Sequence, residues 1–206
     1  SPYTLSLHDA LPISINFFDK NKGLDAGLLK DIINLAVLAP SAFNLQPWEI
    51  IAVKSKEGKE RLYKFSAQPK ILEAPVTLII VGDKTGYESS NSTWQDMLKL
   101  LGGDKEKLAG TQSMAAGLYG TSDQNKLKFA ESNAGLLAMS IMYAAKSLGV
   151  DSHPMSGMDF EGVRKEFGLQ DNKTVVMLIP LGHLDESNTL YPRAYRKGYD
   201  EIVTEV

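Results

Sequence analysis

The sequence predicts a single domain that mixes α-helices with β-strands, and three observations carry this prediction. The chain has 206 residues, which is enough for one substantial core. Three short apolar runs have the length of buried strands, at residues 48–53, 76–81 and 174–181. Stretches with helical patterns lie between these runs, so both kinds of element share one chain.

The composition excludes several classes of protein. Hydrophobic residues make up 43% and charged residues 23%, as in ordinary globular proteins, and the net charge of -3 argues against a nucleic-acid surface. No apolar run approaches the roughly 20 residues of a membrane helix, so we expect no membrane span. The sequence contains no cysteine, which excludes thiol chemistry and suits a reducing compartment, so we expect a cytoplasmic protein.

Common catalytic and metal-binding motifs are missing from the sequence. The three histidines, His8, His153 and His183, have no zinc-binding spacing, so we expect no metal. A glycine-rich dinucleotide fingerprint and a phosphate-binding loop are both absent. Paired carboxylates or a Ser/His/Asp set do not stand out either, so the sequence points to no catalytic side chain.

The first half of the chain begins with a segment that fits no element. Residues 1–13 hold two prolines and no basic residue, unlike a secretory signal, and we expect a foreign leader. Residues 14–206 then form the single domain, with a C-terminal arm from about 185. Asp25 is the predicted N-cap of a helix that runs up to Ala39. The apolar stripe of this helix comprises Leu28, Ile32, Leu35 and Ala36. Another helix is predicted at about 57–65, before the central strand at 76–81.

The second half contains a long helix that the pattern predicts at 124–148, ended by Gly149. Its small and apolar residues lie nearly all round, which predicts burial on most sides, either against a second subunit or inside a monomer. Before it, residues 86–120 have little pattern and one helical piece at 93–101. After it, we expect a short strand at 150–155, a helix from its N-cap Asp159 to Gly168, and the last strand at 174–181.

A polar loop lies between the first helix and the first strand, where residues 40–48 read Pro-Ser-Ala-Phe-Asn-Leu-Gln-Pro-Trp. Pro40 stops the helix, and Pro47 biases Gln46 towards an extended conformation. A loop between two rigid points can hold its polar groups against a planar ligand. From spacing alone, however, a capped loop with a core tryptophan is the simpler interpretation.

This loop resembles the signature loop of the FMN-dependent nitroreductase family, and the similarity runs from about Ile15 to about Val203. The resemblance implies an α+β fold with three α/β/α layers, a central, mostly antiparallel sheet and an intertwined homodimer. It also implies FMN at the subunit interface, NAD(P)H as electron donor, and a small aromatic acceptor of the nitroaromatic or quinone type. Hydride transfer would follow a ping-pong cycle in which the flavin, not a side chain, carries the chemistry.

The resemblance assigns flavin contacts to several segments. In the loop, Ser41 and Asn44 would contact the flavin of the partner subunit. Gln68 and Lys70 would approach the ring, although a solvated loop fits them equally well. His153, which precedes the 154–157 segment, is expected to be packed or to face solvent. The full set of expected cofactor contacts is Ser14, Asn16, Ser41, Ala42, Phe43, Asn44, Gln68, Lys70, Pro154, Met155, Ser156, Gly157, Arg193 and Arg196.

One part of the sequence departs from the family pattern. The family carries a basic Arg-Arg-Ser-x-Arg/Lys run near its N-terminus, and here Pro12 and Ile13 occupy the first two positions. Ser14 matches the motif serine, and the uncharged Asn16 takes the last basic position. Because a cation there would stabilise charge on the reduced ring, we expect weaker FMN binding than is typical. An FMN-poor, non-catalytic binding protein on the same fold is therefore the alternative function.

The substrate side of the site is less defined by the sequence. Trp94, Met97, Met114 and Tyr119 are candidates for lining a pocket for an aromatic substrate, and simple packing is the alternative. A different flavin reaction, such as dehalogenation or flavin destruction, would share the same scaffold. In the C-terminal arm, the resemblance gives Arg193 and Arg196, then Lys197, as phosphate ligands.

Overall fold

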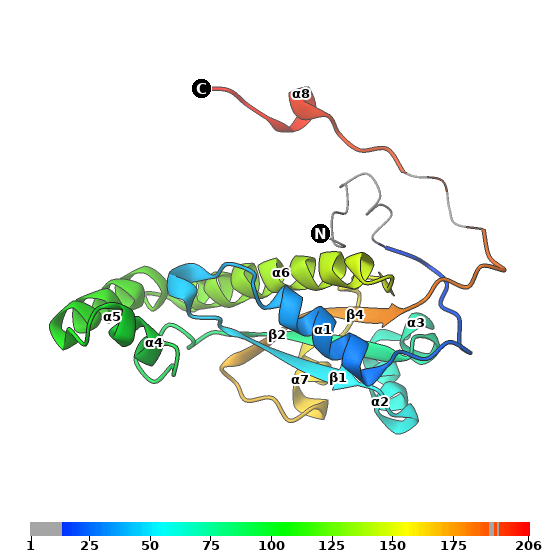
Figure 1. Cartoon of the computed structure of the whole chain (residues 1–206), viewed down its shortest axis with the longest axis horizontal. Helices are drawn as coiled ribbons and strands as arrows, with labels where there is room; N and C mark the ends of the chain where they lie inside the picture. Colours follow the sequence, from blue (N-terminus) through cyan, green and yellow to red (C-terminus); the bar gives the residue numbers. More distant parts are fainter. Residues whose placement is uncertain (1–13, 190–191, 193) are drawn as a thin grey trace.

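A four-stranded antiparallel sheet lies at the centre of the computed structural model, which describes residues 14–189, 192 and 194–206 (Figure 1). The strand order is β1-β2-β4-β3. The strands are β1 (Trp48–Val53), β2 (Val76–Asp83), β3 (Asp151–Ser152) and β4 (Lys173–Gly182). The predicted α+β fold with a central antiparallel sheet is therefore confirmed.

Strand β2 is buried on both of its faces, which explains its unbroken apolar run. Leu78 and Ile80 belong to one buried cluster, whereas Ile79 and Val81 belong to another on the opposite face. Successive side chains of a strand point to opposite faces, so helices must cover both sides of the sheet. This produces the expected three layers.

Helices α1 (Ala26–Ala36) and α6 (Asp123–Ser147) cover one face of the sheet (Figure 1). As predicted, the Asp25 carboxylate caps α1, and Gly149 follows α6 with φ 74°. The end of α1 was predicted too late, because the helix stops at Ala36 rather than Ala39. Leu35 was also placed wrongly on the buried stripe, since its side chain is 43% exposed and Leu29 is buried instead.

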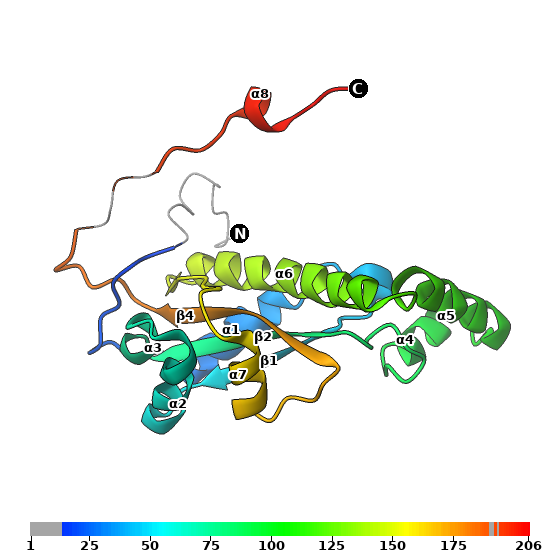
Figure 2. The same cartoon turned by 180° about the vertical axis from the view of Figure 1, so that it is seen from behind.

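The other face is covered by α2 (Lys56–Ser66), α3 (Lys70–Glu73) and α7 (Phe160–Glu166), as Figure 2 shows from behind. Asp159 caps α7 through the N–H of Gly162, as expected. The short helix α3 was not predicted. The predicted strand at 150–155 is shorter in the structure, where only Asp151–Ser152 form β3 and an isolated bridge joins Met155 to Leu178.

Helices α4 (Trp94–Leu100) and α5 (Lys105–Tyr119) extend one end of the molecule (Figure 1). Helix α5 was missed because its apolar pattern is weak: Leu108 and Ala115 are its only buried residues. A third buried cluster joins α4 and α5 to the body and includes the rings of Tyr87, Trp94 and Phe129.

One side of α6 stays open to solvent within a single chain. Leu136 is 48% exposed and Tyr143 is 37% exposed, so one chain alone does not bury the helix on most sides. Burial against a second subunit stays a prediction. The C-terminal arm leads through α8 (Tyr199–Ile202) and extends away from the body (Figure 1). The expected leader, residues 1–13, and the expected ligand Arg193 lie outside the described residues.

Candidate functional site

The polar loop before β1 has an unusual backbone. It contains the 3-10 turn Ala42–Asn44, and Phe43, Asn44 and Gln46 have φ values of 52°, 55° and 49°. Each such left-handed, non-glycine residue costs about 1–3 kcal/mol and persists only where its surroundings impose it. Gln46 was expected to be extended because Pro47 follows it, and that expectation was wrong.

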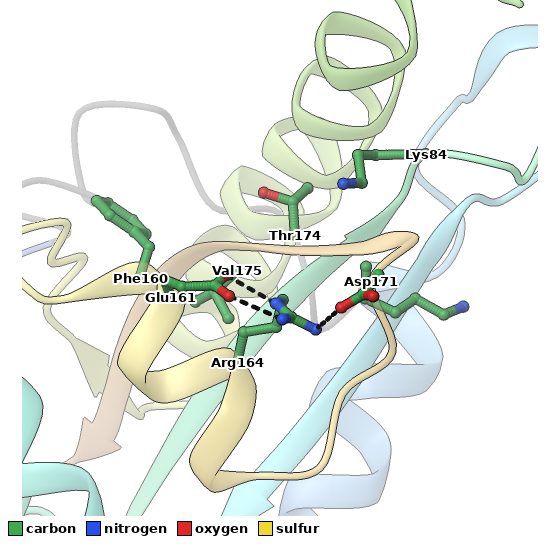
Figure 3. A pocket seen from close by; sticks show the side chains of 8 residues that line it. Lys84, Phe160, Glu161, Arg164, Asp171, Thr174 and Val175 are labelled. Carbon is green, nitrogen blue, oxygen red and sulfur yellow. Dashed lines mark hydrogen bonds and ion pairs between the residues drawn. The ribbon is translucent and has the colours of Figure 1, made fainter. Parts of the chain in front are cut away.

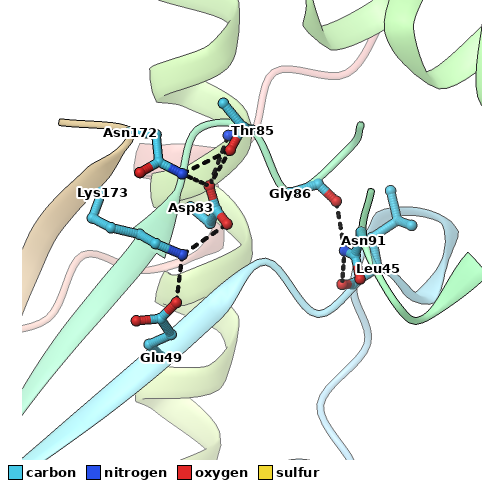
Figure 4. Close-up of polar contacts among 8 residues, drawn as sticks. All are labelled: Leu45, Glu49, Asp83, Thr85, Gly86, Asn91, Asn172 and Lys173. Atoms are coloured by element: carbon cyan, nitrogen blue, oxygen red, sulfur yellow. Dashed lines mark hydrogen bonds and ion pairs between the residues drawn. The ribbon is translucent and has the colours of Figure 1, made fainter. Parts of the chain in front are cut away.

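Hydrogen bonds from three side chains hold this loop. The Ser41 hydroxyl accepts from the Gln46 N–H at 3.0 Å. The N–H of Ala42 donates to Asn133 Oδ1 at 2.8 Å. From the other side, Asn91 Nδ2 donates to the Leu45 carbonyl at 2.8 Å (Figure 4). Both asparagines were missed by the sequence analysis.

Aromatic rings pack behind the loop. The ring centroid of Phe43 lies 6.3 Å from that of Trp94 and 6.3 Å from that of Tyr119. Trp94 is 1% exposed, and its indole N–H donates to the Glu88 carbonyl at 2.9 Å. Met97 packs against the same cluster, whereas Met114 is 60% exposed on α5. Three of the four predicted pocket residues are thus brought together, and Met114 lies apart from them.

A second group of predicted residues gathers around His153. The Ser14 hydroxyl lies 3.0 Å from His153 Nδ1. Burial lowers the pKa of His153, and the nearby positive charge of Lys70 lowers it further. Among the described residues, no carboxylate forms an ion pair with Lys70. Asn16, half-buried, follows two positions after Ser14.

The 154–157 segment is anchored to the sheet and leaves polar backbone at the surface. Met155 and Leu178 exchange two backbone hydrogen bonds of 2.8 Å. The Ser66 hydroxyl donates to the Gly157 carbonyl at 3.0 Å. Ser156 and Gly157 are exposed, while Pro154 is half-buried. Gln68, which was predicted to approach the flavin from a different segment, is half-buried as well.

The two groups lie at opposite ends of the sheet. Trp48, which follows the loop, pairs with Gly82 at the end of β2. Ser152, by contrast, pairs with Leu181, which itself pairs with Val76 at the start of β2. In Figure 1, α5 and α3 accordingly mark opposite ends of the molecule. One chain therefore does not bring the loop and the His153 group together.

Of the two arginines predicted in the C-terminal arm, the structure describes Arg196. Its guanidinium is exposed and donates to the carbonyls of Ala194 and Tyr195 at 3.0 and 3.1 Å. Because the arm extends away from the body (Figure 1), Arg196 joins neither group within one chain.

A hollow of about 360 Å³ lies beside the loop and includes Gln46, Asn91 and Asp83 in its lining. Burial would raise the pKa of Asp83, but hydrogen bonds from Lys173 and Thr85 bring it below its ordinary value. Lys173 Nζ lies 2.8 Å from Asp83 Oδ2 and also contacts Glu49 (Figure 4). The carboxylates of Asp83 and Glu49 at this hollow are therefore both paired with Lys173.

Another hollow, of about 310 Å³, lies between α7 and β4 (Figure 3). Arg164 occupies it and pairs with Glu161 at 2.7 Å and Asp171 at 2.9 Å. Hydrogen bonds from Arg164 lower the pKa of Glu161 to about 2. The guanidinium is thus already matched by two carboxylates, whereas Lys84, which also lines this hollow, forms no ion pair with the described residues. The hollow contains none of the predicted cofactor residues.

A metal site and a membrane-spanning helix are both absent from the described part of the chain. Within residues 14–189, 192 and 194–206, no group of three or more His, Asp or Glu residues could hold a metal ion. No helix in those same ranges combines the length and the apolar character that crossing a bilayer requires.

Comparison with known proteins identifies the family. The family described as "Nitroreductase family" matches residues 13–183. MhqN of Bacillus subtilis, provisionally named an NAD(P)H nitroreductase, is 34% identical over 178 residues, 85% of each chain. A solved structure similar to this chain is that of the provisional nitroreductase ydfN of Bacillus subtilis, with 31% identity and a TM-score of 0.85 over 94% of each chain.

A third similar protein comes from Staphylococcus epidermidis and is provisionally named an NAD(P)H:FMN oxidoreductase. Its crystal structure has a TM-score of 0.86 and 25% identity, and the match covers 98% of this chain and 96% of that one. The sequence resemblance is therefore confirmed. The chain belongs to the nitroreductase family and is an oxidoreductase of that family.

Proposed function

We propose that this protein is an FMN-dependent NAD(P)H oxidoreductase that reduces nitroaromatic or quinone-type acceptors as a homodimer. The observation that carries the proposal is the separation of the two residue groups at opposite ends of one sheet. In a two-fold dimer, the loop of one copy can meet the His153 group of the other. Each interface would then hold one complete cofactor site.

Exposed apolar side chains support a second copy. Leu38 is 78% exposed after α1, and Leu136 of α6 is 48% exposed. On the arm, Tyr195 and Ile202 are 75% and 67% exposed. Large apolar side chains left in solvent suit an interface, and an arm that extends away from the body (Figure 1) suits wrapping around a partner.

The described residues fit FMN in the character of their polar groups. The loop offers the exposed Asn44 amide, and the other group offers the Ser14 hydroxyl and the Lys70 ammonium. Ser156 and Gly157 present exposed backbone groups. These residues would bind the ring and its polar edge, and Arg196 on the arm would bind the phosphate. When bound, FMN supplies the redox chemistry, accepting hydride from NAD(P)H and then passing it to the acceptor.

The side chains of this protein would orient reactants and limit water. Phe43, Trp94 and Tyr119 form an apolar wall behind the loop and restrict its movement. The lowered pKa of His153 keeps its ring neutral near neutral pH, so Lys70 supplies the positive charge of that group. Protons for the acceptor can come from water, which agrees with the lack of an evident acid.

The alternative, an FMN-poor binding protein on the same fold, is favoured by one observation. Asn16 stands where the family has a cation, so the described residues give the His153 group a single ammonium, that of Lys70. The expectation of a cytoplasmic location also stays a prediction.

A visible absorbance spectrum separates the two functions. The purified protein, incubated with excess FMN and then desalted, should be yellow and should bleach when NADH or NADPH is added. A folded dimer that stays colourless after the same treatment would contradict the enzyme and support the alternative. Adding a nitroaromatic compound or a quinone to the bleached protein should restore the colour, which tests the proposed acceptors.

A further inference from the structure

The signature loop is held in a strained conformation by two asparagines that come from distant parts of the chain. Phe43, Asn44 and Gln46 all have positive φ, and none of them is glycine. Side chains from elsewhere must therefore impose this conformation. Asn133 contacts the loop from α6, and Asn91 contacts it from the segment between β2 and α4.

A hydrogen bond within α6 fixes the orientation of the Asn133 side-chain amide. Its side chain is 5% exposed, and its Nδ2 donates at 2.7 Å to the carbonyl of Phe129, one turn earlier in α6. This bond directs Oδ1 towards the N–H of Ala42, which donates to it at 2.8 Å. A reversed amide would place Nδ2 against that N–H and Oδ1 against the Phe129 carbonyl, so only one orientation satisfies both groups.

Asn91 is equally constrained on the opposite side of the loop. Its Nδ2 donates to the carbonyls of Leu45 and Gly86 at 2.8 and 2.6 Å (Figure 4). Its Oδ1 accepts from the N–H and the hydroxyl of Thr93 at 3.0 and 2.9 Å. The amide thus ties the loop to the turn that precedes α4, and its orientation is set by these four bonds.

We infer that Asn91 and Asn133 are positioning residues that hold the loop in the conformation that the cofactor contacts at Ser41 and Asn44 require. The inference rests on the proposed function, because those contacts are its flavin ligands. We call these two contacts clamps: Asn133 accepts from the N–H of Ala42, and Asn91 donates to the carbonyl of Leu45. They act on opposite ends of the turn. Releasing either end lets Phe43 and Asn44 relax towards ordinary φ values and lose their preorganisation.

The test compares three single variants and one double variant by FMN titration and by amide hydrogen exchange. Asn133→Ala should weaken FMN binding about tenfold and Asn91→Ala about fivefold, as expected when a buried hydrogen bond is lost. The double variant should lose less than the product of these factors, because the clamps hold one loop. Asn125→Ala, on the same helix as Asn133, is the matched control, since its amide contacts the Thr121 hydroxyl instead of the loop. It should bind FMN within about twofold of the parent protein.

Amide exchange provides a result that needs no flavin. In the apo protein, the amide of Ala42 should exchange at least about tenfold faster in Asn133→Ala, while Asn125→Ala leaves it unchanged. If the parent protein fails to bind FMN, the proposed function fails, and the exchange at Ala42 alone decides whether the clamp exists. Unchanged exchange and FMN affinities within about twofold of the parent, in variants that stay folded, would overturn the inference. Should Asn133→Ala not fold, Asn91→Ala at the half-buried position still carries the test.

Discussion

The two halves of the proposed cofactor site are built by different physical means. The loop half depends on backbone shape: three strained residues are clamped by hydrogen bonds and backed by aromatic rings. The His153 half follows an ordinary strand edge and offers exposed backbone, the Ser14 hydroxyl and the Lys70 ammonium. Substitutions should therefore act on the first half through geometry and on the second through charge.

The largest expected effect concerns the network that supports the loop half. Lys173 pairs with Asp83, whose backbone N–H donates to the Pro47 carbonyl next to the loop. The side chains of Lys173 and Asp83 are only 13% and 20% exposed, so Lys173→Met should leave a carboxylate poorly solvated. We expect a loss of about 2–3 kcal/mol in the free energy of unfolding, measured by urea denaturation at pH 7. Lys165→Met, at an exposed ion pair, should cost less than about 1 kcal/mol.

The effect of Lys173→Met should also depend on pH. The pKa of Asp83 is lowered by folding, so its contribution is complete above its ordinary value of 3.8 and is lost as the pH falls through the folded-state value. The pKa of Lys173 is raised, so its contribution is complete below 10.5 and is lost as the pH rises through the folded-state value. A difference between parent and variant that persists unchanged in strong acid would contradict this account.

Charge in the His153 half is tested by Lys70→Gln. Removing the only cation that the described residues place there should weaken FMN binding about tenfold, which corresponds to about 1.4 kcal/mol. The affinity of the variant should also depend less on salt than that of the parent. Lys30→Gln, at an exposed position on α1, is the control. Equal FMN affinities for all three proteins would show that charge is not what this half contributes.

Strain in the loop half is tested by two glycine substitutions at left-handed positions. Ala67 has φ 50° at the end of α2, so Ala67→Gly should stabilise the protein by about 1 kcal/mol and leave FMN affinity unchanged. Asn44→Gly, where φ is 55°, should be similarly well tolerated by the fold but should weaken FMN binding, because it removes an amide and frees the loop. Thermal unfolding and FMN titration together separate these outcomes. If both variants bind FMN like the parent, the strain at Asn44 has no function.

The smallest expected effect lies between the two halves, in the core of the sheet. The Thr77 hydroxyl is buried and has no hydrogen-bond partner among the described residues. Thr77→Val keeps the shape and removes the unsatisfied group, so it should stabilise the protein by about 0.5–1 kcal/mol without changing FMN affinity. Thr77→Ser, which keeps the hydroxyl and removes a methyl group, should destabilise it. A stabilising serine would contradict this explanation.

Much of the fold follows from local sequence signals. The apolar run of β1 and the capping residues Asp25 and Asp159 marked their elements because each signal acts within a few residues. Helix α5 could not be found in the same way, since it buries only Leu108 and Ala115 and lacks an apolar stripe. Leu35 was misplaced because the predicted apolar stripe of α1 began at Leu28, whereas the buried face of this helix runs through Leu29.

The site was less accessible to sequence reasoning. A polar residue on the apolar face of α6, between Phe129 and Leu137, was the available signal for Asn133. Asn91 lies in an irregular turn, and its contact with Leu45 bridges 46 positions, so no local pattern reveals it. The left-handed values at Phe43 and Asn44 were hidden because no glycine marks them. Tertiary contacts set these features, and only the structure displays them.

The central claim is that two copies of this chain enclose FMN between the loop of one and the His153 group of the other. Sedimentation velocity of the FMN-loaded protein, recorded at a visible flavin wavelength, tests it most directly. The claim predicts that the colour sediments at twice the mass of the chain, with one FMN per chain. Flavin that sediments with a single chain, or that stays behind as free dye while the protein sediments, would contradict it.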